Sequence, residues 1–219
     1  MTDSETSGAV VILGAGGHAK VIIELFRASG TPIYGLIDKD KTPRRVLGVP
    51  VIGDDEALPS LLGQGAKRAF VALGDNRLRL KMGAWVQALG FDLVNAISPG
   101  ATVSPSAQIG RGVAVMAGAV INAEAQIGDL AIINTGAGVD HDVVLGAACH
   151  IGPGAAIAGS VHIGACALLG IGSSVTPGQA IGEGAVIGGG ACVVCDIAAN
   201  VTAVGVPAVP IKPSSRVII

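Results

Sequence analysis

The residues best suited to chemistry lie in the second half of the chain, where a histidine stands between two carboxylates as Asp140-His141-Asp142. A solvent-facing imidazole beside a carboxylate is a ready general base at neutral pH, because the carboxylate orients the ring and favours its protonated form. Asn134 and His150 also stand out from a surrounding sequence dominated by alanine and glycine. We interpret these five residues as one cluster, with His141 as the candidate base.

The element that must position this cluster is a repeat of six residues. Every sixth residue from Ile97 to Val193 is isoleucine, leucine or valine, with no break of phase. This period is typical of a parallel β-helix in which three short strands make one coil of eighteen residues. The aliphatic side chains then stack inward, and a mostly small residue four positions further on, such as Ala119 or Cys149, keeps the narrow core from overpacking.

Glycine follows the aliphatic residue in many of these hexads. We expect such glycines to serve the corners of the coil, where a backbone with positive φ costs glycine little. They are Gly110, Gly128, Gly146, Gly152, Gly164, Gly170, Gly182 and Gly188.

The repeat predicts that His141 lies near a corner. It comes two residues after the inward-facing Val139, so its side chain should point outward. Eighteen residues further on, and therefore next to it on the following coil, stands Gly159. A glycine at this point leaves room for a thioester and exposes a backbone N–H that can stabilise a developing oxyanion.

A separate unit precedes the coil, because the repeat begins abruptly at Ile97, and we predict domains over residues 1–96 and 97–219. Ala9 to Leu13 is expected to form a buried strand, followed by a glycine-rich turn and an amphipathic helix to about Ala28. Glycine lets the backbone approach a phosphate, which the helix N-terminus attracts. The residues expected at the nucleotide are Gly14, Gly16, Gly17 and His18, the last of which either touches the ligand or is solvated.

A second strand, Ile33 to Ile37, ends at Asp38, where an acidic side chain can hold a ribose hydroxyl, and Lys39 follows as a further substrate contact. Gly74 comes at the carboxyl end of a strand over 69–73, where ligands of open α/β sheets gather, although the next residues, Asp75 and Asn76, are equally suited to cap a helix. The other expected elements are a strand at 51–52, helices over 54–62 and 76–89, and a strand over 91–94. About ninety residues supply one mononucleotide-sized half, which favours a nucleotide-linked substrate over NAD.

Composition excludes several classes of function. A net charge of -2, with 14% charged and 2% aromatic residues, offers no basic face or stacking platform for nucleic acid. The uncharged stretch over 143–182 carries glycine, proline and histidine in the six-residue phase, so no membrane span is expected. The polar start of the chain lacks an apolar signal core, which predicts a cytoplasmic protein. Cys192 and Cys195 form a lone C-x-x-C, which we interpret as structural thiols.

The hexad repeat resembles that of the hexapeptide-repeat acyltransferases, whose coil is left-handed. The order of the glycine-rich turn ending in His18, then Asn134, then Val139-Asp140-His141-Asp142 and finally His150 is similar to that of the bacterial sugar-nucleotide acetyltransferases of the PglD/NeuD type, over essentially the whole chain. The resemblance implies a Rossmann-like α/β domain that binds a nucleotide sugar, followed by a left-handed parallel β-helix along which acetyl-CoA lies. It also implies a homotrimer with its active site between subunits.

The resemblance assigns roles to individual residues. His141 becomes the catalytic base and Asp142 its acidic partner, while Asn134 contacts the sugar. His150 contacts the substrate near the thioester, and Gly159 holds the acetyl carbonyl. The residues expected along the coenzyme A path are Ile171, Gly189 and Pro207. The implied reaction is direct acetyl transfer, without a metal, to the 4-amino group of a nucleotide-linked 4-amino-4,6-dideoxy sugar, with GDP-perosamine as the first expectation and a UDP-linked sugar as the second.

Three alternatives remain open from the sequence. The same scaffold serves sugar O-acetylation of the sialic-acid type. A γ-type carbonic anhydrase shares the coil, but its metal needs two closely paired histidines and a third further away, a spacing that His141, His150 and His162 do not match. The third alternative is a coil protein that binds a nucleotide sugar without catalysis.

Overall fold

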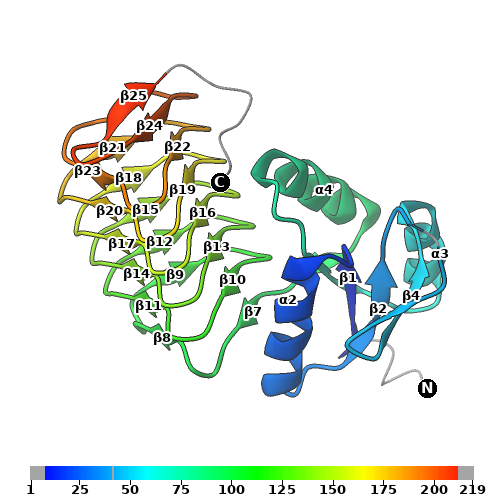
Figure 1. Cartoon of the computed structure of the whole chain (residues 1–219). Coiled ribbons are helices and arrows are strands. Elements are labelled where there is room, and N and C mark those ends of the chain that lie inside the picture. The colour runs from blue at the N-terminus through cyan, green and yellow to red at the C-terminus, as the bar shows by residue number, and fades with distance from the viewer. Residues whose placement is uncertain (1–7, 41, 212–219) are drawn as a thin grey trace. The chain divides into compact units, whose positions relative to one another are not determined.

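The computed structural model describes residues 8–40 and 42–211 (Figure 1). The chain divides into two compact units, Met1–Pro99 and Gly100–Ile219. The boundary that we predicted, after residue 96, falls within a strand, Ala96–Ile97. This strand already belongs to a sheet of the coil, so the exact boundary stays a prediction. None of the helices within the described ranges has the length and apolar character needed to cross a membrane.

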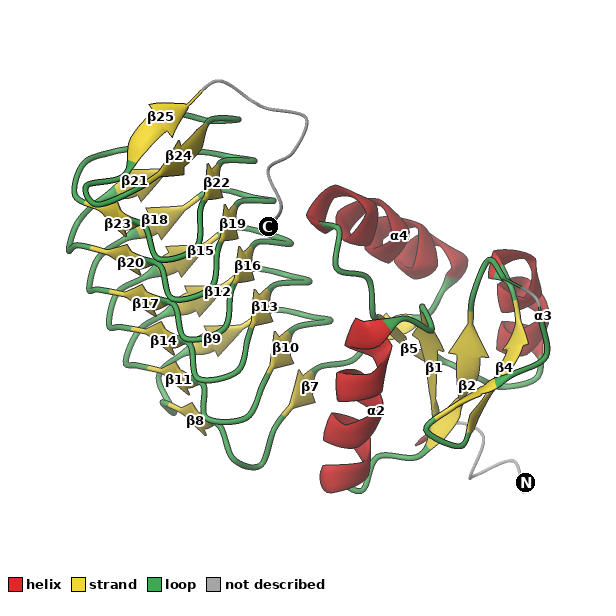
Figure 2. Ribbon diagram, viewed as in Figure 1, coloured by secondary structure: helices red, strands yellow, loops and turns green. Residues whose placement is uncertain are grey.

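The N-terminal unit is built on a mainly parallel sheet with the strand order β3-β4-β2-β1-β5-β6 (Figure 2). Its central strand β1 is fully buried and pairs in parallel with both β2 and β5. The strands are β1 (Val10–Leu13), β2 (Ile33–Ile37), β3 (Arg45–Val46), β4 (Val49–Gly53), β5 (Arg68–Val71) and β6 (Asp92–Leu93). The helical elements are α2 (Gly17–Ala28), η1 (Asp55–Ala57), α3 (Leu58–Gly63) and α4 (Asn76–Leu89).

Most of these elements match the sequence-based expectations to within a few residues. Two differences have local causes. The helix expected over 54–62 begins as the 3-10 turn η1 and becomes α-helical only at α3, which has a proline in its first turn. The short strand β3 was not expected, and it pairs antiparallel with β4 through a tight turn at Leu47 and Gly48, both with positive φ.

The second unit is a left-handed parallel β-helix, as predicted. Three sheets form its sides, and equivalent strands are eighteen residues apart, as in the pairing of Val139 with Ile157. We call the three sides C, D and E and define each by its strands. Side C holds β7 (Ala96–Ile97), β10 (Ala114–Val115), β13 (Ile132–Ile133), β16 (His150–Ile151), β19 (Leu168–Leu169), β22 (Val186–Ile187), β24 (Thr202–Val204) and β25 (Val209–Ile211).

The other two sides are shorter. Side D holds β8 (Thr102–Val103), β11 (Val120–Ile121), β14 (Gly138–Val139), β17 (Ala156–Ile157), β20 (Ser174–Val175) and β23 (Cys192–Val193). Side E holds β9 (Gln108–Ile109), β12 (Gln126–Ile127), β15 (Val144–Leu145), β18 (His162–Ile163) and β21 (Ala180–Ile181). The aliphatic residue of each hexad is the second residue of its strand, and those from Val115 to Val193 are buried, as are small partners such as Ala137 and Cys149.

The prediction that the glycines after the aliphatic residues have positive φ is wrong. Positive φ recurs two residues later, at glycines such as Gly136 and Gly154 but also at Asp142, whose φ is 59°. The predicted glycines are needed instead because neighbouring coils approach closely. A Cβ on Gly128 would lie 2.7 Å from the backbone nitrogen of Ala147 on the next coil.

Replacing Gly128 with alanine is therefore expected to lower the free energy of unfolding by about 1–3 kcal/mol, the usual cost of overpacking. The methyl group meets backbone atoms that cannot turn away as a side chain would. Thermal unfolding followed by circular dichroism measures the effect. Gly138→Ala in β14 is the matched control, because a Cβ there has nothing within 4 Å. An equal loss of stability in both variants would contradict the explanation.

Candidate functional site

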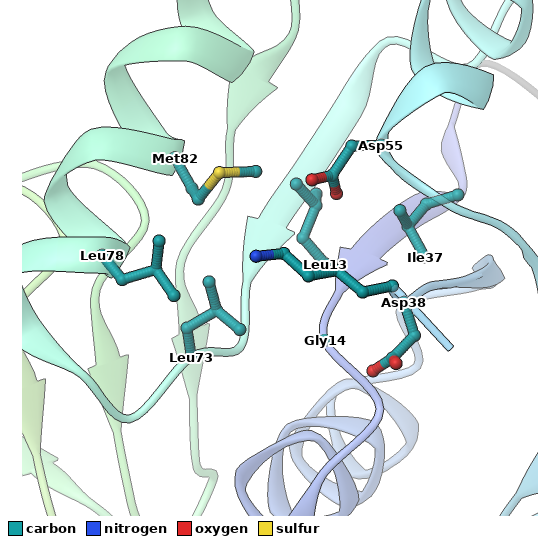
Figure 3. Close-up of a pocket in the computed structure, with 9 residues that line it drawn as sticks. Leu13, Gly14, Ile37, Asp38, Asp55, Leu73, Leu78 and Met82 are labelled. Atoms are coloured by element: carbon teal, nitrogen blue, oxygen red, sulfur yellow. The ribbon is translucent and has the colours of Figure 1, made fainter. Parts of the chain in front are cut away.

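The N-terminal unit contains a pocket of about 190 Å³ at the carboxyl ends of its central strands. The last residues of β1 and β2, Leu13 and Ile37, line it together with the residues that follow them, Gly14, Asp38 and Lys39. Apolar side chains from the start of α4 and from the loop before it form an opposite wall (Figure 3). These are Leu73, Leu78 and Met82, which sequence reasoning missed together with Asp55. This is the position at which open α/β sheets hold their ligands.

Asp38 is fixed in place at the rim of this pocket. Its Oδ2 accepts a hydrogen bond of 2.8 Å from the backbone N–H of Ala15, which ties β2 to the glycine-rich turn. Its Oδ1 accepts a bond of 3.0 Å from the N–H of Asp40 and lies 3.1 Å from Arg44. A carboxylate held in this way has one orientation before any ligand arrives, which suits the predicted contact with a ribose hydroxyl.

The glycines of this turn stand in different structural environments. Gly14 has a φ of 107°, and a Cβ there would lie 2.8 Å from the carbonyl oxygen of Ala72, so this glycine permits close packing of β1 against the end of β5. Gly16 and Gly17 are exposed, and a Cβ added at either position would meet nothing within 4 Å. Gly16 is the N-cap of α2 and has no side chain to cap it, so the first N–H groups of α2 are available to an anion.

His18 is not the solvated residue that we left open as one alternative. It lies in the first turn of α2, and among the described residues its buried Nε2 has no hydrogen-bond partner. Burial, and secondly the charge of Arg79, lowers the pKa of His18 from 6.5 to about 4. Arg79 is itself buried. Because the pKa of His18 lies well below 7, its ring is neutral at physiological pH.

This neutral histidine predicts a loss of stability in acid. Its pKa is lower in the folded chain than in the unfolded one, so the unfolded state binds more protons as pH falls from about 6.5 towards 4. The contribution amounts to about 2 kcal/mol of destabilisation near pH 5 relative to neutral pH. Urea unfolding of the wild type and of His18→Gln at both pH values measures it. The variant should lose less stability in acid, and identical losses would contradict the assignment.

The segment at Gly74 serves the start of α4. Asp75 caps this helix by accepting a hydrogen bond of 2.7 Å from the N–H of Leu78, which confirms the capping alternative. Arg79 turns back and donates to the carbonyl oxygens of Leu73 at 2.8 Å and Gly74 at 3.1 Å. Gly74 does not line the pocket, and its predicted contact with substrate stays a prediction.

On the coil, His141 occupies the corner between sides D and E. Its Nδ1 lies 2.8 Å from Oδ2 of Asp142, and the two side chains are 58% and 59% exposed. The hydrogen bond to Asp142, and then the charge of Asp140, raises the pKa of His141. Asp140 accepts hydrogen bonds from Nδ2 of Asn122 at 2.9 Å and from the backbone N–H of His141 at 2.8 Å, contacts that lower the pKa of Asp140. Asn122, eighteen residues before Asp140, is a site residue that the repeat itself could have indicated.

Gly159 lies directly against the imidazole. A Cβ at this position would be 2.5 Å from Cε1 and 2.7 Å from Nε2 of His141. The histidine ring therefore occupies the place that a side chain at position 159 would take, and the predicted contact of Gly159 with the thioester stays a prediction. The N–H of Ser160 donates to the carbonyl oxygen of His141 at 3.0 Å, which keeps the two coils in register. Within residues 8–40 and 42–211, the Gly159 N–H has no hydrogen-bond acceptor.

Asn134 and His150 form a second group, at the corner between sides C and D. Nδ2 of Asn134 lies 3.0 Å from Nε2 of His150, and the Asn134 Oδ1 accepts a bond of 2.8 Å from the N–H of Thr135. The amide nitrogen can only donate to the ring, so Nε2 is the acceptor and we assign the proton of His150 to Nδ1. The five residues that we interpreted as one cluster therefore fall into two groups within one chain, because β14 separates this group from His141 at the other end of side D.

The residues predicted along the coenzyme A path follow this same corner. Ile171 is 66% exposed, and a Cβ on Gly189, one coil further along, would lie 3.1 Å from its Cγ2. Pro207 follows a cis peptide bond in an exposed turn between β24 and β25. Ile171, Gly189 and Asn134 therefore share a corner that His141 and Gly159 do not. Among the described residues, no three His, Cys, Asp or Glu side chains gather into a group able to hold a metal ion.

A Rossmann-like unit followed by a left-handed β-helix that carries an outward histidine–carboxylate pair defines a hexapeptide-repeat acyltransferase. Comparison with known proteins narrows this class. The family model of the PglD N-terminal domain matches residues 9–86. The chain is 57% identical to a mutant form of perosamine N-acetyltransferase from Caulobacter crescentus, solved in complex with CoA and GDP-perosamine, with 94% of this chain and 98% of that chain covered and a TM-score of 0.93.

Two further relatives match the chain to different extents. The acetyltransferase domain of PglB from Neisseria gonorrhoeae, solved in complex with acetyl coenzyme A, is 42% identical, with 94% of this chain and 100% of that chain covered and a TM-score of 0.88. An uncharacterized protein, L142, of Acanthamoeba polyphaga mimivirus is 34% identical over 113 residues, which are 51% of this chain and only 22% of the viral protein. The chain belongs to the family of PglD-type sugar N-acetyltransferases.

Proposed function

We propose that this protein transfers the acetyl group of acetyl-CoA to the 4-amino group of GDP-perosamine. The observation that carries the substrate is the likeness, over almost the whole chain, to the Caulobacter enzyme whose structure holds CoA and GDP-perosamine. The pocket of the N-terminal unit, with its anchored Asp38, supports a nucleotide as the bound moiety. The uncapped N-terminus of α2, whose first residues are not among those that line the pocket, supports the diphosphate.

The geometry at His141 supports direct transfer. With Nδ1–H donated to Asp142, Nε2 of the ring is the basic nitrogen. The amine nitrogen attacks the thioester carbonyl and forms the new C–N bond, while Nε2 accepts the amine proton. The carbonyl oxygen becomes an oxyanion, for which the N–H of Gly159 is the available donor. When the C–S bond breaks, the imidazolium returns the proton to the sulfur of coenzyme A.

We further propose that the active site is completed between subunits of a homotrimer. Within one chain, side D separates His141 and Gly159 from Asn134, His150 and the predicted coenzyme A residues. Side D carries an open apolar hollow of about 400 Å³, lined in part by Val120, Ala156 and Val175, which suits contact with a second copy. In such an assembly, the His141 corner of one copy meets the Asn134 corner of the next.

Complementation tests this arrangement. His141→Ala and His150→Ala variants should each be nearly inactive alone, and mixed trimers made by unfolding and refolding them together should regain activity. The gain arises because some sites then combine an intact His141 with an intact His150 from another copy. Sedimentation confirms the trimer. Recovery no greater than the sum of the separate activities would contradict a shared site.

The reaction itself is tested with purified protein, acetyl-CoA and a panel of GDP- and UDP-linked 4-amino-4,6-dideoxy sugars. Release of free thiol together with a mass gain of one acetyl group, on a product stable to mild alkali, supports N-acetylation. An alkali-labile product would indicate sugar O-acetylation. Tight binding of a nucleotide sugar without thiol release would indicate a binding protein.

A further inference from the structure

Asp55 is the one carboxylate of the nucleotide pocket without an assigned role. It begins η1, two residues after the end of β4, and its side chain is partly exposed. Figure 3 shows Asp55 and Asp38 on one side of the pocket and Leu73, Leu78 and Met82 on the other, with the Asp55 carboxylate turned towards the pocket. The two aspartates follow strands that lie next to each other in the sheet, since the N–H of Asp38 donates to the carbonyl oxygen of Gly53 at 3.0 Å.

The two carboxylates differ in their partners. Asp38 is already bonded to Ala15, Asp40 and Arg44. Across residues 8–40 and 42–211, the side chain of Asp55 has neither a hydrogen bond nor an ion pair. Because this partly exposed carboxylate has no protein partner among the described residues, both of its oxygens can accept hydrogen bonds from a bound molecule. Asp55 is therefore the carboxylate of this pocket that is free to contact a ligand.

We propose that Asp55 selects guanine as the base of the nucleotide, an inference that rests on the proposed function and sharpens it. With the ribose at Asp38, the base reaches across by about one strand spacing, roughly 4.8 Å, to Asp55. Its flat face packs on the apolar wall. Guanine presents two neighbouring donors, N1–H and the 2-amino group, and an ionised carboxylate accepts both.

Uracil offers a less suitable edge. Its single N–H lies between two carbonyl oxygens, which oppose the charge of a carboxylate that approaches it. The same pocket therefore distinguishes the two nucleotide classes that the sequence left open. Loss of a charge-assisted hydrogen bond in such a site lowers affinity by about 10- to 100-fold.

Calorimetric titration with free nucleotide diphosphates tests the assignment. The wild type should bind GDP about 10- to 100-fold more tightly than IDP, which lacks the 2-amino group, and UDP should bind no better than IDP. Asp55→Asn should weaken GDP by a similar factor and shift preference towards XDP, whose C2 carbonyl accepts a bond from the new amide. Asp92→Asn, the same change at an exposed position of β6, should leave all four affinities unaltered.

Several results would overturn the proposal. They are equal affinity of the wild type for GDP and IDP, binding of GDP to Asp55→Asn as tightly as to the wild type, or binding of none of the four nucleotides. The comparison of GDP with IDP uses the wild type alone, so it decides the matter even if the variant does not fold. These titrations involve no acetyl transfer, so a failure of the proposed reaction is recognised separately, by absent thiol release from a protein that still prefers GDP.

Discussion

Replacing His141 with alanine is expected to lower kcat by about 10²- to 10⁴-fold, the range for loss of one positioned general base. The reason is its geometry. Nδ1 is engaged by Asp142, Nε2 faces Gly159, and the ring is open to solvent, which leaves Nε2 as the nitrogen that can accept the amine proton. Steady-state thiol release with acetyl-CoA and GDP-perosamine measures the change. An unchanged rate in a folded variant would remove His141 from the mechanism.

The pH profile supplies the control for this role. A general base must be unprotonated, so the rate falls as pH falls through the pKa of His141. The hydrogen bond to Asp142, followed by the charge of Asp140, raises that pKa. Asp142→Asn removes the largest of these effects, and the acidic limb of kcat should move to lower pH. A limb that stays in place would show that another group titrates there.

Replacing Gly159 with alanine is expected to lower kcat by about 10²- to 10³-fold, comparable to the loss of an oxyanion donor. The added methyl group would sit 2.5 Å from Cε1 of His141, so the ring must move away from the N–H that we propose as the oxyanion donor. The backbone itself tolerates a Cβ, because Gly159 does not have positive φ. The measured loss should therefore appear in kcat, with little change in the thermal midpoint.

A double variant separates this explanation from simple misfolding. In a His141→Ala background the ring is absent, and Gly159→Ala then removes little further activity. The two effects should be strongly non-additive, as expected for residues in contact. If the losses multiply in the double variant, the imidazole and the glycine act independently.

The sequence predicted the coil well because its physics is one-dimensional. One phase of six residues fixes every inward position, and the period of eighteen identifies vertical neighbours, including His141 with Gly159. The same rule applied to Asp140 leads to Asn122, a residue that our prediction of the site did not include. The period does not say which residues of a turn take positive φ, and for that reason the glycines were assigned to the wrong backbone role.

The residues that line the pocket were harder to predict from the sequence. Asp38 was predicted because it follows a strand, whereas Asp55, Leu78 and Met82 come together only when the loop after β4 and the first turns of α4 fold over the sheet edge. Closeness along the chain was also misleading on the coil. Asn134 and His141 are only seven residues apart, yet they stand at different corners because a β-helix turns between them.

The C-terminal end of the coil also bears on how the molecule avoids open-ended growth into fibres. Each layer of parallel strands offers the next layer a row of unpaired N–H and C=O groups, and an open row of this kind can capture another chain and grow into a fibre. Here β25 reverses direction and pairs antiparallel with β24. In this pairing, Pro210 of β25 lies opposite Ala203 of β24. The proline has no N–H to offer, so β25 interrupts the template that the parallel layers beneath it would otherwise extend.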